Sequence, residues 1–87
     1  MDVVSTDMKI TSEMKKDAED KARELLKNGE INLAEICKLI KGYFDYKYKP
    51  NWHCVIGTNF YTTFSHEENT FIFITIGKVS LLLFKMG

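Results

Sequence analysis

The stretch that decides the fold is Trp52–His66, which reads WHCVIGTNFYTTFSH. It follows the only proline, Pro50, and separates a charged N-terminal half from an apolar C-terminal half. Residues 52–57 begin with aromatic and β-branched side chains, which suit a pleated strand. The segment Gly57–Asn59 supplies turn residues, and large and small side chains alternate over 60–66. The stretch therefore predicts two strands, over 52–57 and 60–66, joined by a short turn.

Two amphipathic helices are predicted before this stretch, over residues 12–28 and 32–48. In both segments apolar residues recur at steps of three and four, which indicates one apolar face. Ser12 or its neighbour is a suitable N-cap for the first helix, and Asn32 with Glu35 forms a capping pair for the second. Lys49 precedes the proline, which disfavours helical backbone there and ends the second helix.

Two further strands are predicted after the stretch, over 70–76 and 79–85. The Gly77-Lys78 pair between them fits a two-residue type II′ hairpin turn. Residues 67–69 turn the strand over 60–66 back onto its successor. Val3 and Val4 predict a short edge strand near the N-terminus. The sequence thus predicts an α+β domain with two N-terminal helices packed on an antiparallel sheet.

The last two strands carry apolar side chains on both faces. An antiparallel sheet with one face in water alternates apolar and polar residues. Here both alternating sets are apolar, and two helices can cover only one of the faces. Because no chain remains to cover the other, we expect a second subunit to do so. The residues that show this pattern are Phe71, Ile72, Phe73, Ile74, Ile76, Leu81, Leu82, Leu83 and Phe84.

The length of 87 residues predicts one small domain, over residues 1–87. Twelve basic and twelve acidic residues give a net charge of zero, so no basic stripe indicates nucleic-acid binding. No apolar run approaches the roughly 20 residues that a helix needs to cross a bilayer, and residues 1–10 do not resemble a signal peptide. Cys37 and Cys54 have no metal-binding spacing, and we expect reduced, buried thiols. We therefore expect a cytoplasmic protein without a membrane span.

The adjacent residues His53 and Cys54 resemble a nucleophile and its base. Neighbouring residues on a strand point to opposite faces, so this pair cannot act together. His66 beside two glutamates at a turn is a weak metal pattern, and no phosphate-binding glycine loop is present. We expect no enzyme activity, no cofactor and no metal site.

The sequence resembles the dynein light chain family, in its smallest, dimeric class. Four short segments match the family in its order, and a weaker match extends back to residues 12–14. The resemblance thus covers nearly the whole chain. The segments are Pro50-Asn51-Trp52-His53-Cys54, then Gly57 with Asn59-Phe60, then Ser65-His66-Glu67, and finally Leu82-Leu83-Phe84-Lys85.

The resemblance implies a strand-exchanged homodimer in which the strand near Phe60 joins the partner's sheet. It also implies an edge groove where extended, disordered partner segments add as one more strand. Expected partners are a second copy, the dynein intermediate chain and other proteins with linear motifs, on the cytoskeleton. The implied dimer interface is His53, Val55, Gly57 and Ser65. The implied peptide-binding residues are Asn59, Phe60, Tyr61, Thr62, Thr63, Phe64, Ser65, His66, Phe71, Phe73 and Thr75.

The chain departs from the family pattern within this groove. Tyr61 stands where the family usually has glycine, and Thr63 and Thr75 stand where tyrosines are typical. Leu33-Ala34 occupies the place of an acidic–basic pair that helps to hold a glutamine of the ligand. Two functions remain open: a dimeric peptide-binding hub, and a structural homodimer with a lost or altered groove and no dynein role.

These departures predict weak binding of the family's common Thr-Gln-Thr ligand. The Tyr61 ring narrows a place where a backbone should approach, and a glutamine amide left unpaired costs about 1–3 kcal/mol. Calorimetry should give an affinity at least roughly tenfold below that of a typical family member measured alongside. A Tyr61→Gly, Thr63→Tyr double variant should recover part of the loss. Tight binding by the unmodified chain contradicts this prediction.

Overall fold

The structure is a computed structural model, and it describes residues 2–9, 12–26, 32–58 and 67–87. The strand expected over 60–66 lies outside these residues, as does the end of the first helix expected over 12–28. The elements in chain order are β1 (Asp2–Thr6), α1 (Glu13–Leu26), α2 (Leu33–Tyr48), β2 (Trp52–Gly57), β3 (Ile72–Ile76) and β4 (Val79–Lys85).

Both helices begin at a side-chain cap. The Ser12 hydroxyl accepts a hydrogen bond from the Lys15 amide at 3.1 Å, directly before α1. The Asn32 side chain accepts one from the Glu35 amide at 3.1 Å, directly before α2. These bonds satisfy N–H groups that lack a partner within the helix. The helix α2 ends at Tyr48, and Lys49 adopts a positive φ of 67° before the proline. Both caps match residues that the sequence indicates as N-caps.

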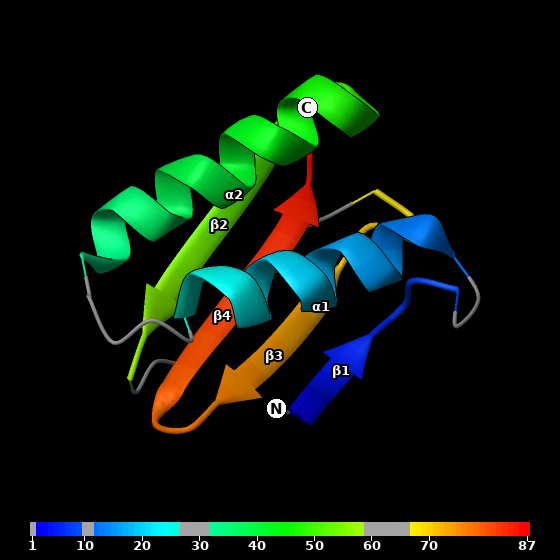
Figure 1. The fold of residues 1–87 in the computed structure, drawn as a ribbon. Coiled ribbons are helices and arrows are strands. Elements are labelled where there is room, and N and C mark those ends of the chain that lie inside the picture. Colours follow the sequence, from blue (N-terminus) through cyan, green and yellow to red (C-terminus); the bar gives the residue numbers. More distant parts are fainter. Residues whose placement is uncertain (1, 10–11, 27–31, 59–66) are drawn as a thin grey trace.

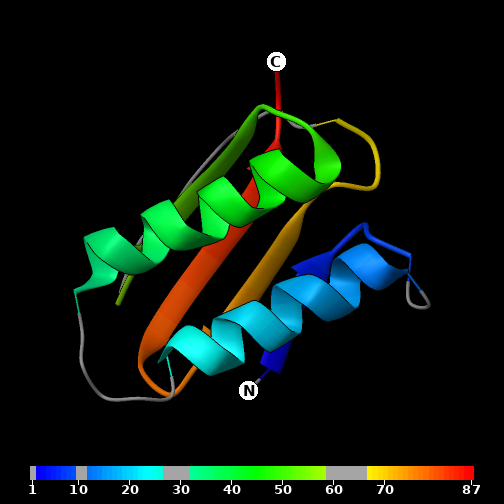
Figure 2. The ribbon, with the colours of Figure 1, turned by 45° about the horizontal axis from the view of Figure 1, so that its top comes forward.

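The four described strands form one antiparallel sheet in the order β1-β3-β4-β2. Figure 1 shows both helices on the same side of this sheet, and Figure 2 shows them as one layer above the strands. The helix α2 packs on β2 and α1 packs on β3. The predicted α+β architecture is confirmed, with helices on one face of the sheet only.

The β3–β4 hairpin has the predicted two-residue turn. Ile76 pairs with Val79, and Gly77 has a φ of 59°, whereas Lys78 does not have a positive φ. A positive φ at the first loop position alone is the pattern of a type II′ turn. Glycine adopts this backbone conformation without steric cost. The turn therefore sets the register that places Phe73 opposite Leu82.

The strand expected from residue 70 begins at Ile72 instead. Just before Ile72, side chains rather than a neighbouring strand form hydrogen bonds with the backbone. The Asp7 carboxylate accepts hydrogen bonds from the amides of Asn69 and Phe71, at 3.0 and 2.9 Å. The buried Thr70 hydroxyl donates to the Glu67 carbonyl at 2.6 Å. Residues 67–71 are therefore a side-chain-bound turn rather than strand.

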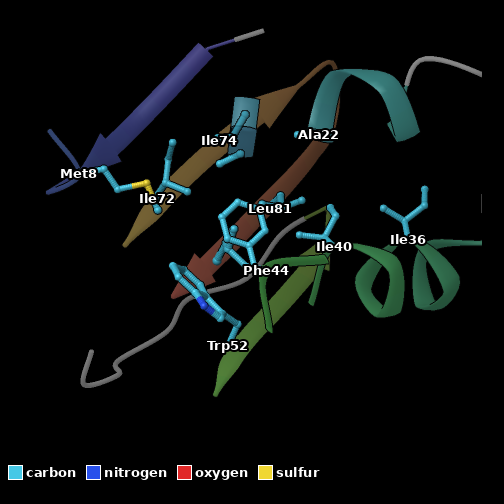
Figure 3. Close-up of a cluster of buried hydrophobic side chains, with 11 residues drawn as sticks. Met8, Ala22, Ile36, Ile40, Phe44, Trp52, Ile72, Ile74 and Leu81 are labelled. Atoms are coloured by element: carbon cyan, nitrogen blue, oxygen red, sulfur yellow. The ribbon is translucent and has the colours of Figure 1, made fainter. Parts of the chain in front are cut away.

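The core lies between the helices and the inner face of the sheet, defined here as the face toward α1 and α2. Phe44 contacts Trp52 edge-to-face, with 4.9 Å between ring centroids, and both side chains are fully buried. Figure 3 shows them beside Leu81 of the central strand β4. The predicted apolar faces of the helices, the strands β3 and β4, and Met8 supply the rest. The buried cluster is Met8, Ala18, Ala22, Ile36, Ile40, Phe44, Trp52, Ile72, Ile74, Leu81 and Leu83.

Besides the buried core, an ion-pair and hydrogen-bond network joins the two helices at their surface. The Lys47 ammonium lies 2.9 Å from a Glu13 carboxylate oxygen and 2.6 Å from an Asp17 oxygen, and the Tyr48 hydroxyl donates to Asp17. Partial burial raises the pKa of Asp17, but the bonds from Lys47 and Tyr48 outweigh this effect and lower it. The link therefore fixes α1 against the C-terminal end of α2.

Phe44→Ala should lower the free energy of unfolding by about 3–5 kcal/mol, because it removes a buried ring and leaves a cavity against Trp52. The matched control is Tyr46→Ala on the same helix. Tyr46 is 90% exposed, so its loss should change stability by no more than about 0.5 kcal/mol. Urea unfolding measures both variants. Equal effects of the two substitutions would contradict the placement of this helix.

Candidate interaction surface on the sheet

The face of the sheet that points away from the helices is called the outer face here. Successive side chains of a strand point to opposite faces, so the residues that alternate with the core residues lie on the outer face. The register aligns Val55, Leu82 and Phe73 in one row across β2, β4 and β3. Neighbouring rows hold His53 beside Phe84, and Gly57, Ser80 and Thr75. The centre of the outer face is therefore apolar, as the two-faced strand pattern predicts.

The exposure of these side chains varies along the row. Val55 is 40% exposed, whereas Leu82 is fully buried although it lies outside the cluster beneath the helices. Phe73 and Phe84 are half-buried. Val55 is therefore the exposed member of this apolar row, whereas Leu82 is already covered within the chain.

His53 lies at one end of the outer face and is exposed in the single chain. Its ring stacks on Phe84, with 5.2 Å between ring centroids, and its Nε2 lies 3.0 Å from the Met86 carbonyl oxygen. The Met86 amide donates to the Asn51 carbonyl at 3.0 Å. His53 thus helps to hold the C-terminal residues against the start of β2.

The strand β2 lies at the end of the sheet and pairs with β4 along one side. Within residues 2–9, 12–26, 32–58 and 67–87, no strand pairs with its other side. Such an edge offers N–H and C=O groups to an added strand. It borders the Val55 end of the apolar row, so the exposed Val55 side chain lies on the strand that forms this edge.

Asp45 of α2 holds the start of β2 in place. Its carboxylate accepts a hydrogen bond from the Trp52 amide at 2.8 Å and is paired with Lys41. Partial burial raises the pKa of Asp45, but the hydrogen bonds from Lys41 and from the Trp52 amide outweigh it. The net pKa of this carboxyl lies below its ordinary value. The charged form of Asp45 is therefore the one that anchors the edge strand.

Some of the residues that we expect in the dimer interface and the peptide groove lie on the same face of the sheet. His53, Val55 and Gly57 share the outer face with Phe73 and Thr75, with β4 between the two strands. Phe71 precedes β3, where its carbonyl accepts a 2.6 Å hydrogen bond from the Thr6 hydroxyl. The expected peptide-binding residues Asn59–His66, Ser65 of the expected interface among them, lie outside the described residues.

Sequence reasoning missed Asp45. An aspartate near the end of an amphipathic helix is an ordinary solvent-facing residue, and its bond to the Trp52 amide needs the chain reversal after Tyr48. The residue before the proline was the one available signal that a reversal occurs there. Among the described residues, no group of histidine, cysteine or carboxylate side chains could hold a metal ion, and no helix could span a bilayer.

Residues 1–86 match the family model described as dynein light chain type 1. The chain belongs to the dynein light chain family. A similar solved structure is the dynein light chain-like domain of a calcium-binding protein from Fasciola hepatica, as a mercury derivative. Its TM-score is 0.84 at 26% identity, with 99% of this chain and 91% of that chain covered. The native crystal of that domain gives a TM-score of 0.77 at 25% identity, covering 98% and 89%.

Membership confirms the resemblance drawn from the four sequence segments. Dynein light chains are non-enzymatic structural proteins that generally dimerise and bind partner peptides. The match also agrees with two helices packed on a four-strand antiparallel sheet. The dimer and the peptide groove of this chain belong to the proposal below.

Asp45→Ala should lower the free energy of unfolding near neutral pH by about 1–3 kcal/mol, because the Trp52 amide loses its acceptor. The folded-state pKa of Asp45 is lowered, so its contribution is present above the unfolded value of about 3.9. It is lost as the pH falls through the folded value. The variant should therefore lose less stability than the unmodified chain on acidification below about pH 4.

Urea unfolding over a pH series makes this measurement. The matched control is Asp20→Ala, which removes an exposed aspartate that pairs with Arg23 at 3.4 Å. This control should leave both neutral stability and acid dependence nearly unchanged. An Asp45→Ala variant with the acid dependence of the unmodified chain would show that Asp45 does not anchor β2 as described.

Proposed function

We propose that this dynein light chain is a non-enzymatic homodimeric hub that binds extended partner segments by strand addition. The observation that carries the proposal is the continuity of the apolar row Val55–Leu82–Phe73 with the edge of β2. Family membership supports dimerisation and peptide binding in general. The outer face and the edge of β2 support the place proposed below for each interaction.

Dimerisation uses the outer face. Both helices lie on the opposite side of the sheet, so they cannot cover Val55 (Figure 2). Burial of apolar surface contributes roughly 25 cal/mol per Å², and a domain of this size buries only a little over roughly 60% of its extended surface alone. A second copy presents the same apolar row, because a two-fold interface uses one patch on both subunits. His53, Val55, Gly57 and Ser65 form this interface.

Strand exchange supplies the second part of the proposal. The partner's strand over 60–66 pairs with the edge of β2, and its own outer edge then accepts a peptide. Each backbone hydrogen bond contributes about 0.5–1.5 kcal/mol, so one peptide alone binds modestly. Two grooves that engage a dimeric partner raise the avidity by roughly 10²–10⁴. Phe71, Phe73 and Thr75 line the groove beneath the peptide together with residues 59–66.

Partners of this hub are proteins with disordered linear motifs, the dynein intermediate chain among them. Such segments add to a sheet edge through backbone hydrogen bonds and are selected by alternate side chains. The proposed location is the cytoplasm, on the cytoskeleton, as is typical of the family. The protein acts by joining two partner chains in parallel rather than by chemistry.

The second candidate function is a structural homodimer without the family's groove. It is favoured by Thr75, a small, half-buried residue on the outer face where the family has tyrosine. Tyr61 and Thr63 depart in the same region of the sequence. Peptide calorimetry separates the two candidates, because both require the dimer and only the hub binds a linear motif.

Val55→Glu should convert the homodimer to monomer at micromolar concentration. The substitution places a carboxylate at the centre of the proposed interface and opposite its own copy, so desolvation and repulsion oppose association. Sedimentation equilibrium measures the dimer constant, and circular dichroism tests whether the fold is retained.

The matched control is Val4→Glu. Val4 is a valine on the other end strand, β1, and is 59% exposed. We expect this variant to sediment as a dimer with the unmodified dimer constant. If the unmodified chain is a folded monomer at micromolar concentration, or if Val55→Glu dimerises as well as Val4→Glu, the outer face is not the dimer interface.

A further inference from the structure

Two cysteines meet where α2 packs on β2. The Cys37 thiol donates a hydrogen bond to the Cys54 carbonyl, with 3.6 Å between sulfur and oxygen. Both cysteines are free, and both are half-buried rather than sealed in the core. The sequence predicted buried thiols in separate elements, and the fold brings these elements together. A pair of neighbouring, partly accessible thiols has a chemistry that neither cysteine has alone.

The direction of each side chain favours contact between the two sulfurs. Cys54 shares the inner face of β2 with Trp52 and Ile56, so its side chain points toward α2. Cys37 follows the buried Ile36 on the helix face that packs against this strand. Burial raises the pKa of the Cys54 thiol, and its contact with the Cys37 thiol raises it further. Cys54 therefore stays protonated near neutral pH.

We propose that Cys37 and Cys54 form a reversible intrachain disulfide when the protein meets a low-molecular-weight disulfide such as oxidised glutathione. The Cys37 thiolate attacks one sulfur of the oxidant and releases a glutathione thiolate, which leaves a mixed disulfide at Cys37. Cys54 then loses its proton and attacks the Cys37 sulfur, and the second glutathione thiolate leaves. Two protein thiols are oxidised, one glutathione disulfide is reduced, and the two protons pass to the two glutathiones.

The bond would close a loop between residues 17 apart in sequence, from the first half of α2 to the middle of β2. This loop contains Phe44, Asp45 and Trp52, which already hold the helix to the strand. Oxidation therefore stabilises the folded chain, because the bond restricts the unfolded chain. Val55 and His53 point to the other face of β2, so the disulfide leaves the outer face unchanged. The proposal concerns one chain and does not depend on dimerisation.

The experiment exposes the reduced protein to oxidised glutathione, then stops the reaction with acid and alkylates all remaining thiols with a maleimide under denaturing conditions. We expect an intact mass lower than the reduced mass by two hydrogen atoms, no maleimide adduct, and a single-chain band on a non-reducing gel. At fixed protein concentration the melting temperature should rise by roughly 10 °C and return after reduction.

Two single variants serve as matched controls. Cys54→Ser keeps Cys37 and should retain one glutathione, because the second step has no nucleophile. Cys37→Ser keeps Cys54, whose raised pKa leaves little thiolate, and should stay mostly unmodified over the same time. Neither variant should show the rise in melting temperature.

Three results would overturn the proposal. They are two maleimide adducts on the oxidised native chain, a lasting glutathione adduct on it, and a covalent two-chain band on the gel. The measurement on the native chain decides the outcome even if a variant fails to fold. Failure of this test leaves the dimer proposal intact, because sedimentation tests that separately.

Discussion

The structure depends on one constraint: its sheet is apolar on both faces, while its helices cover only one. The hairpin β3–β4 supplies Ile74 and Leu81 to the core and Phe73 and Leu82 to the outer face. Burying apolar side chains is the main favourable term in folding, and a chain of this size has little other surface to bury. The proposed second copy of the chain would relieve this constraint, and dynein light chains generally dimerise.

The strand β2 makes contacts on both of its faces and lies both against the core and at the sheet edge. Its first residue, Trp52, packs on Phe44, and the amide of that residue binds Asp45. Its inner face contacts α2 through Cys54, and its outer face presents Val55 beside a sheet edge. The same strand therefore belongs to the core, to the proposed dimer interface and to the proposed redox pair.

Much of the fold could be predicted from the sequence, because the signals for it are local. Each of these features depends on nearby residues: the caps at Ser12 and Asn32, the II′ turn at Gly77, and the end of α2 before Pro50. The apolar outer face followed from alternation within two strands. Asp45 and the Cys37–Cys54 contact could not be predicted, because both require the helix and strand to be placed in space. The late start of β3 has the same origin, since Asp7 binds residues more than sixty positions away.

The most direct test of the central claim is an isotope-filtered nuclear Overhauser experiment on a mixture of labelled and unlabelled chains, which detects contacts between subunits only. If a second copy covers the outer face, the Val55 methyl groups show contacts to the other chain. The Leu81 methyl groups, which lie beneath the helices, show contacts within their own chain alone. Intersubunit contacts at Leu81, or none at Val55 in a sample that sediments as a dimer, would contradict the claim that a second copy covers this face.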